Sequence, residues 1–554
     1  MWRRLRMELL PEKPGRLALV FFLLLGLGLG ASFLSEPAAA ANRQAKVNAV
    51  LQEPLSAIRV LSGESIHLSW KPEGHEALFH FQRAVERGEV GLADLLMRVP
   101  REEDRAVYRA YHRRMAAIGS RQEKDEALRW NRVVAQWGDS VARMPTMEAD
   151  VLRRTGQIAK ARQAYAEAFA MWESQYAFFW MLKLATLQGD RAALQELTAH
   201  PGFRSWAPLP AQAEVWEALQ HWDDLLVTLF QVQVQKAFSY PGLAAFYLWL
   251  LGFALLILIC QVDQQNWKVL GVGVMASLLG ASATVLTLLG EAMHGGLSTL
   301  GAGLSEGDLL WESVTGLALR EEASKLSFLA LLAPALLLIR ARRLHVIFAS
   351  AALGLGFAAS ENTTYLMDVG TFPLFRFLFA SFLHMFWAGI TGYALMGLVR
   401  RRDGKALACL VLVFVSCLVA HGTWNAFSLL PSWAPYHLFS FLILLVTGWA
   451  FFHCIRQRRD PHPEARLQSA EAYVFAMGAV ASVSLFRVAW HQSIWAAFEE
   501  FGSLLVGVAL VGFFFLREFN RVDRGLDLVM HPSRRKKASA PETATLLPSS
   551  KGNW

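Results

Sequence analysis

Residues 315–339 read TGLALREEASKLSFLALLAPALLLI, an apolar run that contains Glu321, Glu322 and Lys325. The run is long enough to cross a bilayer, which takes about 20 mostly apolar residues. A charge near the bilayer centre costs roughly 2.5–3.5 kcal/mol on insertion scales, so charged residues there usually pair or line a cavity. The stretch therefore predicts a membrane helix that contributes polar groups to a buried site.

The three apolar runs that follow also carry polar side chains. These are Glu361 and Asn362 in residues 345–366, His384 in residues 374–399, and His421 and Asn425 in residues 406–429. If successive helices alternate in direction, all four sets lie roughly 8–15 Å below one membrane surface at 1.5 Å per residue. Carboxylates and imidazoles can activate water, and an amide can stabilise an oxyanion. The pattern predicts a water-using site inside the membrane.

The whole chain predicts an all-α polytopic membrane bundle of about ten spans. It has 554 residues, of which 54% are hydrophobic, and this is too apolar and too segmented for one soluble domain. The other predicted spans are residues 17–34, 243–260, 269–290, 436–455, 472–490 and 497–516. The last two are interrupted by Arg487, Glu499 and Glu500.

Basic residues indicate how the spans are oriented. Arginines cluster after the runs that end near residues 339, 399 and 455, whereas residues 291–314 contain no Lys or Arg. The positive-inside rule then places both termini in the cytoplasm. As a separate expectation, the chain lies in the inner membrane of a bacterial cell. We interpret the net charge of +8 as topology, and we expect no nucleic-acid partner.

The expected domain organisation follows from these spans. It consists of a cytoplasmic N-terminus with a first anchor (1–35), an extracytoplasmic helical domain (36–240), a membrane core (241–455), two additional spans (456–520) and a basic cytoplasmic tail (521–554). The first apolar run is long for a signal peptide, so a retained anchor is favoured over a segment cleaved near Pro37–Ala40.

The helical domain contains a spacing typical of tetratricopeptide repeats. Gly156, Ala161, Tyr165 and Ala168 follow the small/large pattern of the second helix of that repeat, and Gly189 lies 33 residues after Gly156. The same pattern also occurs in ordinary Ala-rich helical bundles. Under either interpretation we expect a docking surface.

Spacing within the motif helices is compatible with chemistry and also with plain structure. Glu321 and Lys325 are i,i+4 neighbours that can neutralise each other, whereas Glu322 is rotated by about 100°. A charged interfacial turn is the structural alternative for this motif. A helix cap at Glu361, or an interhelical hydrogen bond at His421, is an equivalent alternative.

The ordered set of motifs resembles the PrsW intramembrane proteases. The four motifs in their order along the chain are Glu321-Glu322-x-x-Lys325, Glu361-Asn362, His384-x4-Gly389 and His421-x-x-Trp424-Asn425. They span about 110 residues. PrsW proteins are in turn similar to the superfamily of CAAX-prenyl and bacteriocin-processing enzymes.

The resemblance implies an endopeptidase in which Glu321 or Glu322 is the base that activates water. His384 and His421 would assist or hold a metal, and Asn425 would stabilise the oxyanion. Lys325, Glu361, Asn362 and Trp424 would support the site. It also implies membrane-anchored substrates of the anti-sigma-factor class, held within the lipid bilayer.

The residues themselves leave a metal open. A set of Glu361, His384 and His421 is able to bind zinc, which would lower the pKa of a bound water. The alternative is water activated by glutamate alone. Two other functions also remain: a proton- or ion-coupled transporter, because buried Glu and His relay protons, and an inactive scaffold that presents the helical domain.

Overall fold

The computed structural model describes thirteen segments of the chain. They are residues 23–27, 31, 102–120, 122–137, 144–172, 175–262, 266–293, 305–366, 373–430, 432–433, 438–457, 468–491 and 494–524. The described residues are 91% helical and include no strand, so the predicted all-α class is confirmed. Most of the predicted first span and cytoplasmic tail, and residues 36–101 of the predicted helical domain, lie outside the described residues.

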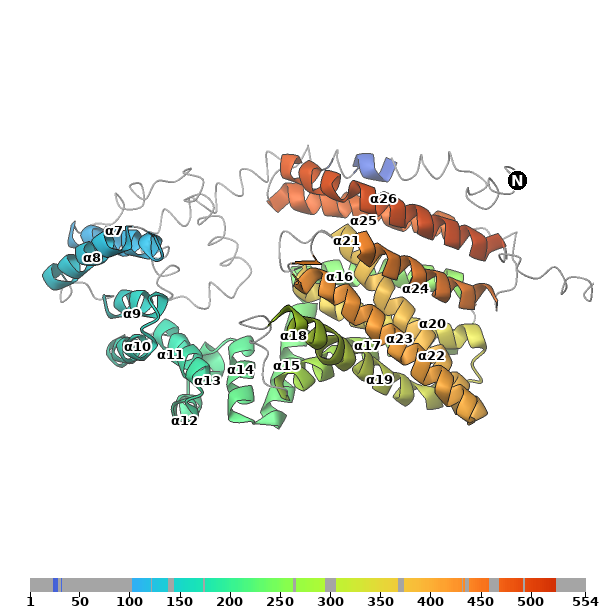
Figure 1. Cartoon of the computed structure of the whole chain (residues 1–554), viewed down its shortest axis with the longest axis horizontal. Helices are drawn as coiled ribbons and strands as arrows, with labels where there is room; N and C mark the ends of the chain where they lie inside the picture. The colour runs from blue at the N-terminus through green and yellow to red at the C-terminus, as the bar shows by residue number, and fades with distance from the viewer. Residues whose placement is uncertain are drawn as a thin grey trace, which may run out of the picture.

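A bundle of long helices forms the larger part of the molecule (Figure 1). Its elements are α16 (Tyr240–Ile259), α17 (Trp267–Met293), α18 (Glu306–Trp311), η2 (Glu312–Ala318), α19 (Leu319–Leu338), α20 (Arg343–Tyr365), α21 (Pro373–Arg376), η3 (Phe377–Ser381), α22 (Phe382–Arg401), α23 (Gly404–Leu429), α24 (Leu438–Arg456), α25 (Ser469–His491) and α26 (Ile494–Arg524). Within the described residues, seven segments are long and apolar enough to cross a membrane. The protein is therefore a polytopic membrane protein. Residues 315–339, which the sequence predicts as a span, fall in η2 and α19, and α19 is not among the seven; it carries four charged residues near its start.

Helix α20 lies at the centre of the bundle and is buried along most of its length. Glycines allow its neighbours to approach closely. A Cβ at Gly354 would lie 2.1 Å from the His384 carbonyl oxygen on α22, and one at Gly356 would lie 1.9 Å from the Ser277 carbonyl oxygen on α17. Small residues permit backbones to pack in this way inside membranes. The contact at Gly354 sets the distance between α20 and the helix that carries His384.

The last two helices pair with each other, and several of their charged side chains have partners within the protein, whereas Glu499 is exposed. Arg487 on α25 is buried and donates from Nη2 to the Leu366 carbonyl oxygen at the end of α20, at 2.6 Å. Glu518 on α26 is fully buried and pairs with Arg456 on α24 and with Arg521 at 3.2 Å. Because buried charges are tolerated when paired and hydrogen-bonded, the charges in this predicted helix pair are compatible with its packing.

The helical domain is a series of short helices. These are α7 (Glu102–Ala117), α8 (Glu123–Trp137), α9 (Met144–Arg154), α10 (Ile158–Trp172), α11 (Gln175–Gln188), α12 (Arg191–Ala199), α13 (Phe203–Trp206), α14 (Leu209–Leu219) and α15 (Trp222–Ala237). Ala161, Tyr165 and Ala168 are fully buried on α10. Gly156 and Gly189 occupy turns with φ of 76° and 64°, which glycine adopts without strain. The tetratricopeptide interpretation stays a prediction.

The helical domain joins the bundle through α15 at one end of the membrane helices (Figure 1). Leu225 and Leu229 of α15 belong to one apolar cluster with Val285 and Ala292 of α17. Two hydrogen bonds, described below, connect α15 to α20. The domain is therefore fixed to the bundle beside the end of α20 that carries Glu361.

Candidate active site

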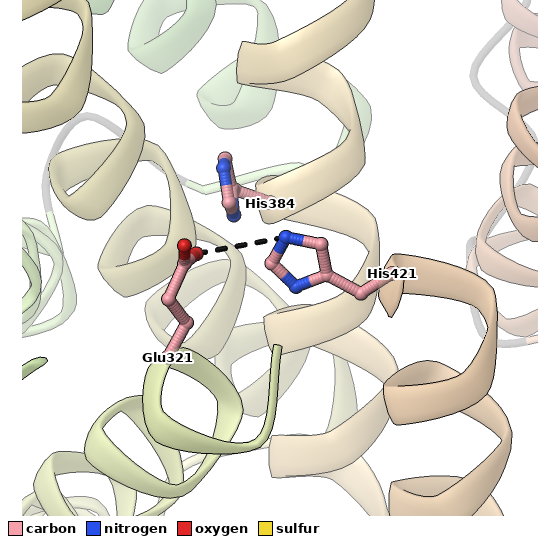
Figure 2. Close-up of side chains that lie close together, drawn as sticks. All are labelled: Glu321, His384 and His421. Carbon is pink, nitrogen blue, oxygen red and sulfur yellow. Dashed lines mark ion pairs between the residues drawn. The ribbon is translucent and has the colours of Figure 1, made fainter. Parts of the chain in front are cut away.

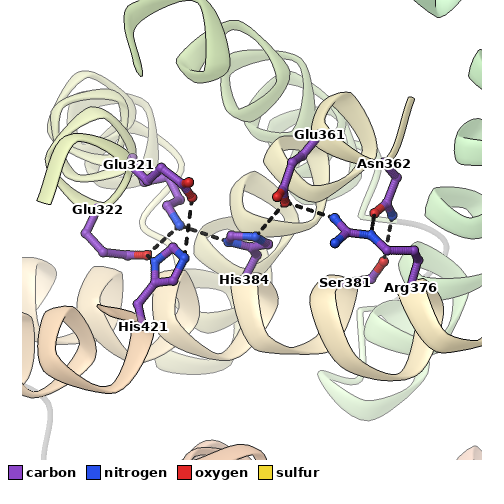
Figure 3. A network of polar contacts seen from close by, with 9 residues as sticks. Glu321, Glu322, Glu361, Asn362, Arg376, Ser381, His384 and His421 are labelled. Atoms are coloured by element: carbon purple, nitrogen blue, oxygen red, sulfur yellow. Dashed lines mark hydrogen bonds and ion pairs between the residues drawn. The ribbon is translucent and has the colours of Figure 1, made fainter. Parts of the chain in front are cut away.

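Four helices bring their polar residues together in one row (Figure 3). Glu321, Glu322 and Lys325 come from α19, Glu361 and Asn362 from α20, His384 from α22 and His421 from α23. Glu322, Lys325, His384 and His421 are each at most 4% exposed, and Glu321 is 7% exposed. Groups that the sequence separates by up to 100 residues thus share one buried site.

Lys325 lies between Glu322 and His384 in this row. Its Nζ donates to Glu322 Oε1 at 2.5 Å and lies 3.0 Å from His384 Nδ1. It also lies 4.5 Å from the centroid of the Phe357 ring. The expected partner was Glu321 at i,i+4, but the lysine pairs with Glu322 at i,i+3 instead. Glu322 is therefore neutralised by Lys325.

Glu322 is also held by His421. Glu322 Oε1 lies 2.8 Å from His421 Nδ1. This contact orients the imidazole so that its other nitrogen, Nε2, faces Glu321. Trp387 stacks on the His421 ring with centroids 4.4 Å apart. Such a carboxylate behind a histidine is the usual way to orient an imidazole for work at its other nitrogen.

Glu321 differs from Glu322 in having a free oxygen. Its Oε2 is buried, lies 3.6 Å from His421 Nε2, and has no hydrogen-bond partner among the described residues. A buried carboxylate oxygen without a partner is costly unless water, an ion or a substrate group satisfies it. Of the two glutamates, Glu321 is the one whose oxygen remains available.

A candidate metal site follows from this geometry. One ligand atom each from Glu321, His384 and His421 lie within 4.8 Å of one another, and all three residues are buried (Figure 2). The orphaned Oε2 of Glu321 and the carboxylate-plus-two-imidazole donor set fit a catalytic zinc, which takes three protein ligands and leaves one position for water. The set differs from the predicted one, in which Glu361 took the place of Glu321.

Glu361 is occupied by other partners. Its Oε2 lies 2.9 Å from His384 Nε2 and 3.1 Å from Arg376 Nη2. Arg376 Nε also donates to Asn362 Oδ1 at 2.6 Å, and Asn362 Nδ2 donates to Ser381 Oγ at 3.2 Å. Within the Glu-Asn motif, Glu361 contacts His384 Nε2, and Arg376 connects Glu361 with Asn362 (Figure 3).

Sequence reasoning missed Arg376. The signal was present, because an arginine stands near the start of the apolar run at residues 374–399, eight residues before His384. An isolated cation in such a run needs a carboxylate partner. The guanidinium carbon of Arg376 also lies 4.1 Å from the centroid of the Tyr365 ring, which is a cation–π contact.

Trp424 and Asn425 lie at the edge of the site, both half-buried. Trp424 stacks on Phe379 of η3, with ring centroids 6.0 Å apart. Among the described residues, no hydrogen bond joins the Asn425 amide to the row of polar groups. Asn425 lies one helical turn after His421 on α23.

Two π-helical segments precede the motif residues. The segment η2 runs directly into α19 and its glutamates, and η3 runs directly into α22 and His384. Wide turns of this kind are rare and occur frequently at functional sites, because they change which side chains face inward. Gly422 on α23 allows η2 to pack closely, since a Cβ there would lie 2.6 Å from Val314 Cα.

The comparison with protein families covers this region. Residues 268–451 match the family model of the PrsW family intramembrane metalloproteases. The chain contains a PrsW-family domain. The PrsW domain extends from α17 into α24 and includes every residue of the polar row. No curated protein and no solved structure matches the chain.

The family match identifies a membrane protease that acts on a protein substrate in the bilayer. It also supports metal-dependent chemistry, in agreement with the buried donor set of one carboxylate and two imidazoles. The helical domain and helices α25 and α26 lie outside the matched residues.

Proposed function

We propose that the PrsW domain is an endopeptidase that hydrolyses peptide bonds of membrane-anchored proteins with a water activated by Glu321. The observation that carries the proposal is the contrast between two adjacent glutamates. Glu322 is bound by Lys325 and His421, whereas Oε2 of Glu321 faces His421 without a hydrogen-bond partner among the described residues.

The chemistry needs a base, a polarising group and a proton donor. The water oxygen bonds to the carbonyl carbon while its proton passes to Glu321, and the same proton then goes to the leaving nitrogen as the C–N bond breaks. The low dielectric of the membrane interior strengthens each of these interactions. In this proposal the amide of Asn425 donates to the developing oxyanion, because it follows His421 by one helical turn on α23.

His384, His421 and one carboxylate oxygen of Glu321 would hold a metal ion in this site, and the other oxygen of Glu321 would then take the water proton. Such an ion supplies a Lewis acid that polarises the carbonyl and makes water more acidic. Glu361 orients His384 from Nε2, and Glu322 orients His421 from Nδ1. A metal bound by His384 would use Nδ1, which lies 3.0 Å from Lys325 Nζ, so the lysine would give up that contact when the ion binds. The protein contribution is thus a set of fixed imidazoles around one available carboxylate.

The substrate we propose is a protein with a single membrane span. A buried site between helices is reached most directly by a segment that already lies in the bilayer. The anti-sigma-factor class rests on the sequence resemblance alone.

The test is cleavage of single-span substrates by purified protein in liposomes. Glu321→Gln keeps the shape of the side chain but removes its basicity, so we expect at least about a 100-fold loss of kcat, within the range of general-base catalysis. Glu196→Gln, at an exposed position of α12, is the matched control and should leave cleavage unchanged. Full activity of Glu321→Gln would contradict the proposal.

Metal dependence has a separate readout. Elemental analysis of the purified protein should find about one equivalent of a divalent transition metal, as expected for a site with three protein ligands. The double variant His384→Ala/His421→Ala should lose that metal while keeping its helical circular dichroism. Retention of metal by this variant would place the ion elsewhere.

A further inference from the structure

Helix α15 presents an apolar ridge that no described residue covers. Leu226, Phe230 and Val234 are 40%, 56% and 41% exposed, and Phe238 just after the helix is 84% exposed. These residues are four apart, so at about 100° per residue they lie along one side of the helix. Single exposed apolar residues are ordinary, but an aligned row of large ones marks an interaction surface.

The opposite side of α15 is packed against the membrane bundle. Leu225 and Leu229 are buried in the cluster shared with α17. Gln233 Oε1 accepts from Ser360 Oγ at 3.2 Å, and Lys236 Nζ donates to Thr364 Oγ1 at 3.1 Å. Both partners lie on α20, which is long and apolar enough to span a membrane. Helix α15 therefore contacts a candidate membrane span in its polar last turns, at the end that carries Glu361.

The ridge is followed along the chain by the exposed apolar residues of α16. Leu243, Phe246 and Leu250 of α16 are 61%, 55% and 48% exposed in a segment long and apolar enough to span a membrane. Only Ser239 and the first residues of α16 separate them from Phe238. Figure 1 shows α15 at the end of the bundle where the helical domain joins, running across the direction of α25 and α26.

The third side of α15 carries two glutamines and one valine. Gln231 and Gln235 are exposed and lie roughly 100° around the helix from Phe230 and Val234, respectively, and Val227, one turn before Gln231, is 57% exposed. A helix with one packed side, one apolar side and one side that is polar in its second half fits the boundary between protein, acyl chains and water. Interfacial amphipathic helices lie in the membrane plane with the apolar side buried about 5–10 Å into the headgroup region.

We propose that α15 lies in the bilayer interface on the helical-domain side of the membrane, with the ridge of Leu226, Phe230, Val234 and Phe238 in contact with lipid acyl chains. The occupant of this surface is lipid because the ridge is continuous with the exposed apolar side of α16. The helical domain is then seated on the membrane surface, and Gln233 fixes it beside Ser360, the residue before Glu361.

The experiment uses spin labels on the full chain in phosphatidylcholine nanodiscs. Single cysteines replace Phe230 and Val234 on the ridge, and Gln231 and Gln235 on the polar side as matched controls, in a background with the four native cysteines changed to serine. Power saturation measures collisions with oxygen, which partitions into lipid, and with a water-soluble nickel chelate. We expect an oxygen-to-nickel ratio several-fold higher at 230 and 234 than at 231 and 235.

Two outcomes would overturn the proposal. Equal nickel access at all four positions would mean that the ridge faces water. Low access to both reagents at 230 and 234 would mean that a protein, a second copy or another part of this chain covers the ridge. Circular dichroism and thermal unfolding of each labelled variant, compared with the cysteine-free chain, show that the fold survives the substitution.

Discussion

The guanidinium of Arg376 connects both residues of the Glu-Asn motif, and through Glu361 it acts on His384. The arginine contacts Glu361 Oε2 and Asn362 Oδ1 with two different nitrogens, and Glu361 in turn contacts His384 Nε2. We infer that Arg376 is a positioning residue. It fixes the carboxylate that orients one of the two imidazoles facing Glu321.

Replacing Arg376 with Met should therefore lower kcat without unfolding the protein. Loss of an outer partner of a ligand histidine typically costs about 10–100-fold in metal affinity or activity. Steady-state cleavage in liposomes should show the loss in kcat more than in KM, and Arg376→Lys should recover part of it by restoring one contact to Glu361.

The matched control is Arg401→Met at the far end of α22, where Arg401 is exposed and pairs only with Asp403 among the described residues. Its kcat should equal that of the unmodified chain. An unchanged kcat for Arg376→Met, or a loss that Arg376→Lys does not reduce at all, would show that the arginine does not act through Glu361.

For single residues, the sequence predicted which side chains share the buried site but not which of them form pairs. Intramembrane carboxylates and imidazoles are rare enough that their identities indicated one site. The partner of Lys325 depended on side-chain direction, because positions three and four residues away are both in reach on a helix. The choice of Glu322, and the replacement of Glu361 by Glu321 in the metal set, follow from contacts with α22 and α23 that no local pattern contains.

At the scale of elements, the distance between α20 and α22 depends on Gly354. A methyl group there would lie 2.1 Å from the His384 carbonyl oxygen and 2.8 Å from Ala388 Cβ. Gly354→Ala should therefore destabilise the protein by about 1–3 kcal/mol, as overpacking does, and shift His384. We expect a lower midpoint of thermal unfolding in detergent together with slower cleavage.

The control for this substitution lies on the same pair of helices. Gly397 on α22 has no atom within 4 Å of an added Cβ, so Gly397→Ala should be neutral or stabilise by up to about 1 kcal/mol through helix propensity. If both variants had the same unfolding midpoint, close packing at Gly354 would not determine the helix spacing.

Helix positions after residue 240 were largely predictable because apolar runs of bilayer length have few other structures available. Predicted residues 345–366 and 374–399 correspond to α20 and to the α21–η3–α22 segment. The π-helical turns were not predictable, since Glu312–Ala318 and Phe377–Ser381 have no distinctive composition. One of them, η2, packs closely against Gly422 of α23, a contact between segments far apart in the sequence.

At the scale of the whole molecule, the helical domain and the polar row lie toward the same end of the bundle. Ser360 contacts α15, and the next residue, Glu361, contacts His384. Basic residues lie at the opposite end, where Arg340 and Arg342 connect α19 to α20 and Arg343 begins α20. We therefore propose, by the positive-inside rule, that the helical domain and the site lie on the extracytoplasmic side.

The position of the cut in a substrate tests this arrangement. The polar row lies near the helical-domain end of α20, so a single-span substrate should be cleaved on that side of the bilayer midplane. Mass spectrometry of both products, made in liposomes with the substrate in a known orientation, should place the new terminus within about two helical turns, or roughly 11 Å, of that interface. A Glu321→Gln reaction supplies the background. Cleavage near the opposite interface would mean that substrates enter from the side of the basic loops, and the helical domain would then have no direct access to the segment that is cut.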